Sequence, residues 1–290
     1  MPEWPDLEVY RHALHTRLVG RPIAALRAPD AFVVRTFDPP LASLVGEVVC
    51  DIRRIGKRIA IGTHGDLWLV VHLMVLGRLH FRPAPAKVPK TALLVLENDL
   101  GTLWLTESGS KRRASVHVLR GWAAAQAHDR GGLEVMDADI PTFATALRSQ
   151  RRTLKRALCD PSILAAIGNA YSDEILHAAQ LSPLQLTTNL SDDEIGRLHG
   201  SIHRVLLQWR DLLQAEAGDT FPEHVTAFRP EMAVHGKFGQ PCPVCQAPVQ
   251  RIVYADNQCN YCARCQTGGR LLADRAMSQL LKDSWPKTLG

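Results

Sequence analysis

Four cysteines near the C-terminal end constrain the fold of this chain more than any other feature. They form two C-x-x-C pairs, Cys242/Cys245 and Cys262/Cys265, with sixteen residues between the pairs. Each pair places two thiolates on one turn, and two such pairs suit the tetrahedral coordination of Zn²⁺. The intervening run QRIVYA has the composition of a strand. We therefore predict a β-hairpin held together by a structural Zn²⁺, which contributes folding energy rather than chemistry.

Cys259 offers a second ligand set for the same metal. It stands three residues before Cys262, so Cys242, Cys245, Cys259 and Cys262 would form an alternative site. We favour Cys265 as the fourth ligand because the final C-x-x-C mirrors the first. The remaining cysteines are then expected to behave as small apolar side chains: Cys50, Cys159 and Cys259.

The composition is that of an ordinary folded protein with room for two domains. Of the 290 residues, 46% are hydrophobic and 22% are charged, which argues against disorder and fibrous repeats. The formal net charge of +5 is compatible with a nucleic-acid partner, although many soluble enzymes carry as much. Charge alone therefore does not assign a function.

No segment of the sequence has the pattern of a membrane span or a signal peptide. The longest apolar run, residues 67–77, is too short to cross a bilayer and contains His72. The first residues carry Glu3, Asp6 and Glu8, where a signal peptide would need basic and then apolar residues. We expect a cytoplasmic, nucleoid-associated protein without a membrane partner, whose paired cysteines bind metal rather than form disulfides.

Apolar periodicity predicts one helix followed by several strands in the first 120 residues. The helix, at residues 5–19, has apolar side chains at helical spacing: Leu7, Tyr10, Leu14 and Leu18. From residue 23 to about 118 the pattern changes to short β-branched and aliphatic runs: VVCDI, RIAIG, LWLVVHL, RLHF, TALLVLE and TLWLT. Turn signals at residues 63–66 and 97–101 separate runs that could pair as hairpins. This pattern predicts an antiparallel sandwich or barrel.

The second half of the chain has a helical pattern. It follows an Ala-rich and Gly-containing stretch at residues 121–132, which we interpret as a linker. The longest helix begins at SDDEIG, where Ser191 and Glu194 form a capping-box pattern. Its apolar face predicts buried core rather than a cofactor site: Ile195, Leu198, Ile202, Val205, Trp209 and Leu212.

The N-terminal stretch MPEWPDLE allows two interpretations. Pro2 suits the entry to a helix, because its φ is fixed and its missing N–H costs nothing there. Alternatively, removal of Met1 leaves the secondary amine of Pro2 free beside the carboxylic acid of Glu3. On this stretch alone the first interpretation is favoured.

The ordered set of motifs along the chain resembles the formamidopyrimidine-DNA glycosylase / endonuclease VIII family. The motifs are MPEWPDLE, RRIGKR, HLMVLGRL, LKRALCDPSILAAIGNAYSDEIL and VHGKFGQPCPVC, and the resemblance extends from Met1 to about Gln266. It implies an α+β fold: an N-terminal antiparallel β-sandwich with flanking helices, a helical domain with a helix-two-turn-helix, and a C-terminal zinc β-hairpin. The corresponding ranges are 1–120, a hinge at 121–132, 133–225, 226–270, and an additional tail at 271–290, where Met277, Leu280 and Leu281 suggest a short helix.

The resemblance implies a DNA glycosylase with AP lyase activity. Near pH 7 roughly a tenth of an α-amine is neutral and nucleophilic. The Pro2 nitrogen would attack C1′ of a damaged or abasic nucleotide, and the resulting iminium would act as the electron sink for strand cleavage. Glu3 would protonate the sugar ring oxygen. Lys57 falls on the lysine that contacts DNA near the lesion, and we group it with the catalytic residues.

The same resemblance implies a set of DNA contacts. Asn169 would bind a phosphate, aided by Gly168 and the N–H groups at the start of the following helix. The other positions carried over are Asp6, which stands where the family usually has glutamate, His72, Lys155, Arg112, Arg113 and Asn257. For His72 and Lys155 a core histidine and a surface helix charge are the respective alternatives. The partner expected is damaged DNA, for a monomer with no small-molecule cofactor.

Three positions depart from the family pattern. Asn257 stands where an arginine would grip the phosphates flanking the flipped nucleotide. Val75 stands where a methionine would fill the gap left by that nucleotide; Met74 beside it would face the other way in a strand. The loop ESGSKRRAS keeps charge at Lys111, Arg112 and Arg113 but has no aromatic wedge. These departures leave the lesion preference open, with a DNA-damage-binding protein as the alternative function.

Overall fold

The structure is a computed structural model that describes all residues except 110, 224, 226–227, 255–256, 273–287 and 290. The helix predicted around Met277, Leu280 and Leu281 lies outside the described residues. The chain divides into two compact units, residues 1–130 with 209–226 and residues 131–208 with 227–290. The boundary at 130/131 falls inside the predicted linker. No helix in the described part is long and apolar enough to cross a membrane.

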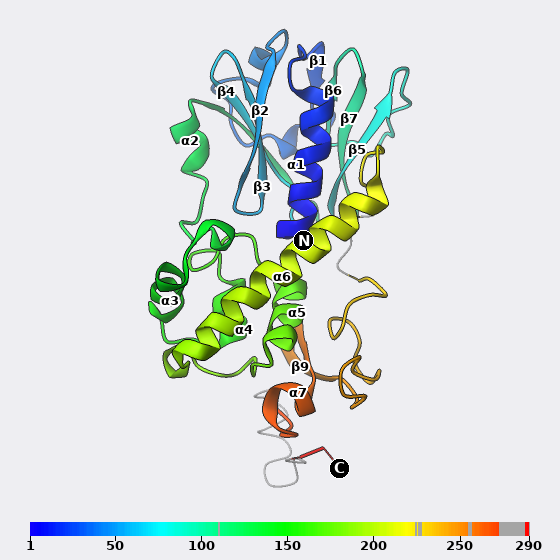
Figure 1. Ribbon diagram of the computed structural model, residues 1–290. Coiled ribbons are helices and arrows are strands. Elements are labelled where there is room, and N and C mark those ends of the chain that lie inside the picture. The colour runs from blue at the N-terminus through cyan, green and yellow to red at the C-terminus, as the bar shows by residue number, and fades with distance from the viewer. Residues whose placement is uncertain (110, 224, 226–227, 255–256, 273–287, 290) are drawn as a thin grey trace. The chain divides into compact units, whose positions relative to one another are not determined.

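The first unit contains two four-stranded antiparallel sheets (Figure 1). One sheet has the order β1-β6-β7-β5, with β1 Ala25–Arg27, β5 Gly77–Pro83, β6 Leu94–Glu97 and β7 Gly101–Glu107. The other has the order β2-β3-β4-β8, with β2 Val49–Ile55, β3 Arg58–Thr63, β4 Leu67–His72 and β8 Ser115–Arg120. The predicted turns at residues 63–66 and 97–101 do join paired strands, β3 to β4 and β6 to β7. The sandwich prediction is therefore confirmed.

The helix α1 (Trp4–Leu18) packs its apolar face into the core of the sandwich. Leu7, Tyr10, Leu14 and Leu18 are all fully buried, as the helical spacing predicted. They join inward side chains from both sheets, such as Leu69 and Leu105, in one cluster. The alternation of buried and less buried residues along β5 and β8 shows why these segments form strands with one face on that core.

The predicted linker contains a short helix, α2 (Trp122–Gln126). Trp122 lies against Trp68 of β4, with 4.6 Å between the ring centroids. Ala125 is fully buried in the same small cluster on the outer face of the sheet. Residues 122–126 therefore form part of the first unit, because their aromatic and small apolar side chains cover the sheet.

The second unit is helical apart from one hairpin. Its helices are α3 Ile140–Arg148, α4 Leu154–Cys159 and α5 Asn169–Ala179, and α6 Asp192–Ala217 contributes residues to both units. The capping box is present at the start of α6: Ser191 N donates to Glu194 Oε2 at 3.0 Å, and Glu194 N donates to Ser191 Oγ at 3.2 Å. The hairpin has β9 Gln250–Tyr254 and β10 Asn257–Tyr261, followed by α7 Ala263–Thr267. Four short 3₁₀ turns complete the described elements: η1 Ala31–Val33, η2 Leu41–Leu44, η3 Val135–Asp137 and η4 Thr187–Asn189.

Candidate active site and DNA interface

The start of α1 is built on two buried acids. Glu3 is the N-cap residue, and its backbone N–H donates to Asp6 Oδ2 at 2.8 Å. Both carboxylic acids are 3% exposed, and Pro2 is buried beside them. Asp6 was predicted to contact DNA, but the structure buries it and uses it as a cap acceptor. This arrangement holds the Glu3 backbone in place at the end of the chain.

The N-terminal amine lies among four charged side chains. The structure includes Met1, so its amine stands one residue before the amine that Pro2 would present. Burial lowers the pKa of this amine below its ordinary value of 8.0, and the cations Arg78 and Lys57 lower it further, against the opposing effect of Glu3 and Asp6. A lowered pKa increases the neutral, nucleophilic fraction at neutral pH.

Lys57 occupies the tight turn between β2 and β3. Ile55 pairs with Arg58 across this hairpin, so only Gly56 and Lys57 form the turn. Gly56 has a φ of +52°, a conformation that glycine adopts without strain. Arg54 steadies the turn by donating to Gly56 O at 3.2 Å. The predicted Lys57 is therefore placed at a hairpin tip in the same unit as the N-terminal amine.

Arg78 was not identified from the sequence. It is the second residue of β5, and its guanidinium donates to Val75 O at 3.2 Å and to Gly77 O at 2.7 Å. Arg78 therefore fastens the preceding loop as well as acting on the amine of Met1. A single arginine inside an apolar strand pattern gives no sequence signal for such a position.

The loop before Arg78 is a turn rather than a strand. Gly77 N donates to Leu73 O at 2.9 Å, and Met74 has a φ of +54°. The expectation that Met74 and Val75 alternate across a strand is therefore wrong here. Instead, Val75 and Leu76 are both exposed, at 54% and 44%.

The loop between β7 and β8 is held by Glu107. Its Oε2 accepts the backbone N–H groups of Arg113 at 2.7 Å and Ala114 at 2.8 Å. Arg112 pairs with Asp30 at 2.9 Å on the surface, and Arg113 is exposed. The two predicted DNA-binding arginines are therefore accessible, but one already has a carboxylate partner.

His72, another predicted contact, ends β4 and is half-buried. Burial lowers the pKa of His72 to about 4, and Arg58, Lys57, Arg130 and His117 add to the shift. The imidazole is thus neutral at neutral pH, so it offers a hydrogen bond rather than a charge.

Lys155 lies under the first turn of α5. It is 6% exposed, and its Nζ donates to Asn169 O at 2.6 Å, Ser172 Oγ at 2.8 Å and Asp173 Oδ1 at 2.6 Å. The alternative of a surface helix charge is therefore wrong. Burial disfavours the charged ammonium, but Asp173 outweighs it and raises the pKa of Lys155 above its usual range.

Asp173 links this lysine to the segment before the cysteine hairpin. Its Oδ2 accepts from Asn260 N at 3.1 Å and lies 2.8 Å from His235 Nδ1. Although burial opposes ionisation, Lys155 and His235 hold the pKa of Asp173 below its ordinary value. The sequence analysis did not identify Asp173 or His235. The two are 62 residues apart in the chain, and the other partners of Asp173 lie in α4 and β10.

Asn169 and Gly168 lie at the start of α5, as predicted. Gly168 is the N-cap and Asn169 the first helical residue. The Asn169 side chain donates to Gln258 O at 3.1 Å, which connects the helix start to β10. Asn257 is the exposed first residue of β10.

In the same hairpin, the Arg251 guanidinium lies 4.2 Å from the Phe238 ring centroid.

The four predicted cysteines come together around one point. The Sγ atoms of Cys242, Cys245, Cys262 and Cys265 all lie within 4.8 Å of one another. Cys242 and Cys265 are 3.9 Å apart, and Cys245 and Cys262 are 3.3 Å apart. Tetrahedral Zn–S bonds place sulfurs about 3.8 Å apart. This group could bind a metal ion, so the four thiols fit the predicted zinc.

Cys259 is fully buried in a separate apolar cluster with Ile252 and Tyr261. The alternative ligand set is therefore not the one that the structure assembles. His177 of α5 lies 3.3 Å from Cys242 Sγ and connects the helix to the cysteine group.

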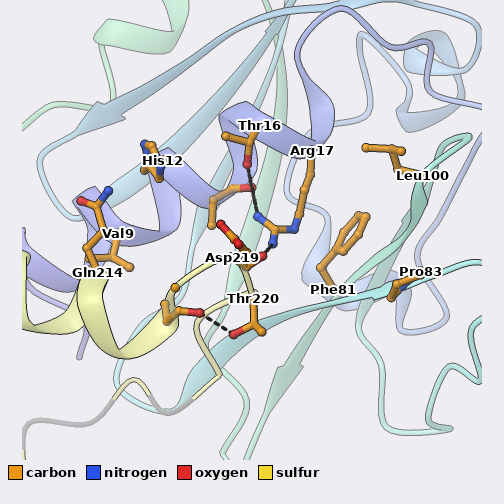
Figure 2. Close-up of a pocket in the computed structure, with 13 residues that line it drawn as sticks. Val9, His12, Thr16, Arg17, Phe81, Pro83, Leu100, Gln214, Asp219 and Thr220 are labelled. Carbon is orange, nitrogen blue, oxygen red and sulfur yellow. Dashed lines mark hydrogen bonds between the residues drawn. The ribbon is translucent and has the colours of Figure 1, made fainter.

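A pocket of about 480 Å³ lies elsewhere in the first unit, along α1 and the end of α6 (Figure 2). Arg17 occupies its centre, where it donates to Thr16 Oγ1 at 3.2 Å and to Asp219 O at 2.5 Å. Phe81 forms part of the wall. None of the predicted catalytic residues lines this pocket.

Comparisons with known proteins assign the buried acid beside the N-terminal amine, the helix start in the second unit and the four-cysteine hairpin to one family. Residues 1–113 match the formamidopyrimidine-DNA glycosylase N-terminal domain, and residues 133–210 match the formamidopyrimidine-DNA glycosylase H2TH domain. The formamidopyrimidine-DNA glycosylase of Heliobacterium modesticaldum is 31% identical over 281 residues, which cover 92% of this chain and all of that protein. The chain belongs to the formamidopyrimidine-DNA glycosylase family.

Two further comparisons agree with this assignment. A solved complex of Lactococcus lactis Fpg with DNA containing an abasic site has a TM-score of 0.81 and 25% identity, over 91% of this chain and 99% of that chain. An uncharacterised formamidopyrimidine-DNA glycosylase-like protein of Mycobacterium tuberculosis is 38% identical over 151 residues, 52% of this chain and 94% of that protein.

Proposed function

We propose that the Pro2 amine, freed by removal of Met1, is the nucleophile of a combined glycosylase and AP lyase reaction. The observation that carries the proposal is the gathering of the N-terminal amine, Glu3, Lys57 and Arg78 in one unit. Burial and two cations favour the neutral form of the Met1 amine, and Pro2 beside it is also buried. The neutral amine is the form that attacks. A helix lead-in alone does not require such neighbours.

The reaction follows from these groups. The Pro2 nitrogen forms a bond to C1′ as the base leaves, and Glu3 protonates the ring oxygen when the sugar opens. Because Pro2 is a secondary amine, the product is a cationic iminium. Loss of a proton from C2′ then expels the 3′ phosphate by β-elimination, with the iminium accepting the electron pair. Lys57 contacts DNA beside the reacting sugar.

The second unit supplies a phosphate site. Gly168, Asn169 and the first N–H groups of α5 are suited to an anion. Lys155 and Asp173 act by fixing this helix start against β10 rather than by touching DNA, which their burial supports. The metal of the cysteine group is Zn²⁺, and it secures the hairpin on which Asn257 stands.

The partner is damaged or abasic-site DNA, the ligand in the solved complexes of Lactococcus lactis Fpg. The alternative, a damage-binding protein without excision, is favoured by two observations. The β7–β8 loop has no aromatic residue, and Asn257 provides no charge.

Borohydride trapping on an abasic-site duplex tests the proposal. Wild-type protein, with loss of Met1 verified by mass spectrometry, should give a covalent adduct. Pro2→Gly should give much less, and a protein with an extended, uncleaved N-terminus should give none. Salt-dependent DNA binding without any wild-type adduct would instead support the damage-binding protein.

The zinc proposal is tested by metal analysis of the purified protein. We expect one Zn²⁺ per chain, lost in Cys242→Ser. A protein that contains no zinc but retains its DNA affinity would contradict the proposal.

A further inference from the structure

Two aromatic rings in the first unit are almost completely exposed. Phe32 is 84% exposed and Phe37 is 91% exposed, the highest fractions among the large hydrophobic side chains that the structure describes. Burying one such ring is worth about 1.5–3 kcal/mol. Two rings left in water on one short segment are therefore an unusual arrangement.

The backbone that carries these rings is held against the edge of a sheet. Arg35 N donates to Val116 O at 2.8 Å, and Val118 N donates to Thr36 Oγ1 at 2.7 Å. Val33 between the rings is 4% exposed and packs in the main core. The segment is thus anchored along β8, so its exposed rings are presented from an ordered backbone.

Cations extend from this segment toward the N-terminal amine. Arg35 is exposed beside Val116 of β8, and the preceding residue of β8, Ser115, pairs with His72 of β4. Arg58 donates to His128 O at 2.9 Å and pairs with His72 in the sheet.

Two further cations of the first unit, Lys57 and Arg112, lie at the two ends of this series. Lys57, which acts on the N-terminal amine, stands in the β2–β3 turn next to Arg58. At the other end, Arg112 pairs with Asp30 at 2.9 Å, which neutralises the carboxylate nearest to Phe32 in the sequence. Lys57, Arg58 and Arg35 therefore form a cationic track between the N-terminal amine and the two rings.

We propose that Phe32 and Phe37 are stacking sites for unpaired bases of a DNA strand whose phosphates follow these cations. Exposed aromatic rings beside a cationic track are the features that bind single-stranded nucleic acid without sequence preference. The inference rests on the proposed function. It narrows the proposed substrate from damaged DNA to damaged DNA with unpaired nucleotides near the lesion. An apolar protein partner would have no need of the adjoining cations.

Binding to two labelled strands tests the inference. One is a 13-mer of thymidines with a central tetrahydrofuran abasic site, and the other has the same backbone with every base removed. Each stacked base should contribute about fivefold or more in affinity. We expect Phe32→Leu/Phe37→Leu, which removes both stacking sites, to weaken binding to the thymidine strand by at least about 25-fold and to leave binding to the baseless strand unchanged.

Two control variants separate stacking from exposure of apolar surface. Phe32→Tyr/Phe37→Tyr keeps both rings and should retain wild-type affinity. Val45→Ala removes another exposed apolar side chain of the same unit, 45% exposed, and should have no effect. Equal affinity of the leucine variant and wild type for the thymidine strand would overturn the inference. So would an equal loss on both strands, which indicates a structural role of the two rings.

Borohydride trapping on an abasic-site duplex keeps the two proposals separate. The leucine variant should trap at the wild-type rate when the duplex is saturating. Wild-type trapping without any ring-dependent binding of the thymidine strand would contradict this inference alone. Absence of trapping in the wild type would contradict the proposed function.

Discussion

Lys155 Nζ lies 2.6 Å from Asp173 Oδ1, and both side chains are buried. The pair joins α4 to α5 directly beneath the residue proposed to bind phosphate. The other oxygen of Asp173 faces His235 and Asn260 of the cysteine-containing segment. The carboxylate of Asp173 therefore fixes the helix start to the hairpin, together with the bond from the Asn169 side chain to Gln258 O.

Removing one partner of this pair should be strongly destabilising. Lys155→Met leaves the Asp173 charge buried with less compensation, and the expected loss is about 3–5 kcal/mol in the free energy of unfolding. Lys155→Met/Asp173→Asn should cost less than the sum of the single changes. Urea unfolding measures these values, with Arg156→Met, at the exposed neighbouring position, as the control. A loss no greater than that of the control would show that the pair does not hold α5.

The rate of borohydride trapping should rise with pH through the pKa of the N-terminal amine. Burial lowers the pKa of the Met1 amine below 8.0, and Pro2 beside it is buried as well, so we expect the half-maximal rate below pH 8.0. Arg78 also lowers the pKa of the Met1 amine, and we expect it to act in the same way on Pro2, so Arg78→Met should move the profile to higher pH and Arg78→Lys should restore it. A profile that is unchanged in Arg78→Met would contradict this role of Arg78.

Acid should destabilise the first unit through two histidines. Burial is the largest cause that lowers the pKa values of His72 and His117, each to about 4. The unfolded chain binds these protons near pH 6.5, so between about pH 6.5 and 4 it holds more protons than the folded chain. Stability conferred by the neutral imidazoles is therefore complete above pH 6.5 and is lost as the pH falls toward 4.

The measurement for these histidines is the urea midpoint over that pH range. His72→Gln/His117→Gln should show a shallower decline than the wild type. His12→Gln, at an exposed position of α1, serves as the control. Parallel curves for the wild type and the double variant would exclude both histidines as the source.

A cation at position 257 should strengthen DNA binding. Asn257 is exposed at the start of β10, where an added guanidinium can reach a phosphate. Asn257→Arg should increase the magnitude of the slope of log K against log salt by about 0.9. Asn257→Gln is the neutral control and should leave the slope unchanged. A slope that is the same in all three proteins would place position 257 away from the DNA.

Local sequence patterns predicted the features that depend only on residues close together in the chain. The capping box of Ser191 and Glu194 forms as expected, since both bonds span only three residues. The two C-x-x-C pairs gather because tight turns bring each pair of thiols together. The exposed turn of Val75 and Leu76 was misjudged, because an apolar run does not show where a chain leaves one sheet for another.

The sequence by itself determined the helix at the N-terminus, the strands and the cysteine group, because periodicity and spacing depend on residues close together in the chain. It also determined the family, because the motifs follow one another in a fixed order. Only the tertiary structure decided which charges are buried and which groups surround the amine. Lys155 and Arg78 resemble surface cations in the sequence, yet one is enclosed by Asp173 and the other acts on the N-terminus. Burial and electrostatic interaction depend on distances between segments far apart along the chain, and these exist only once the chain has folded.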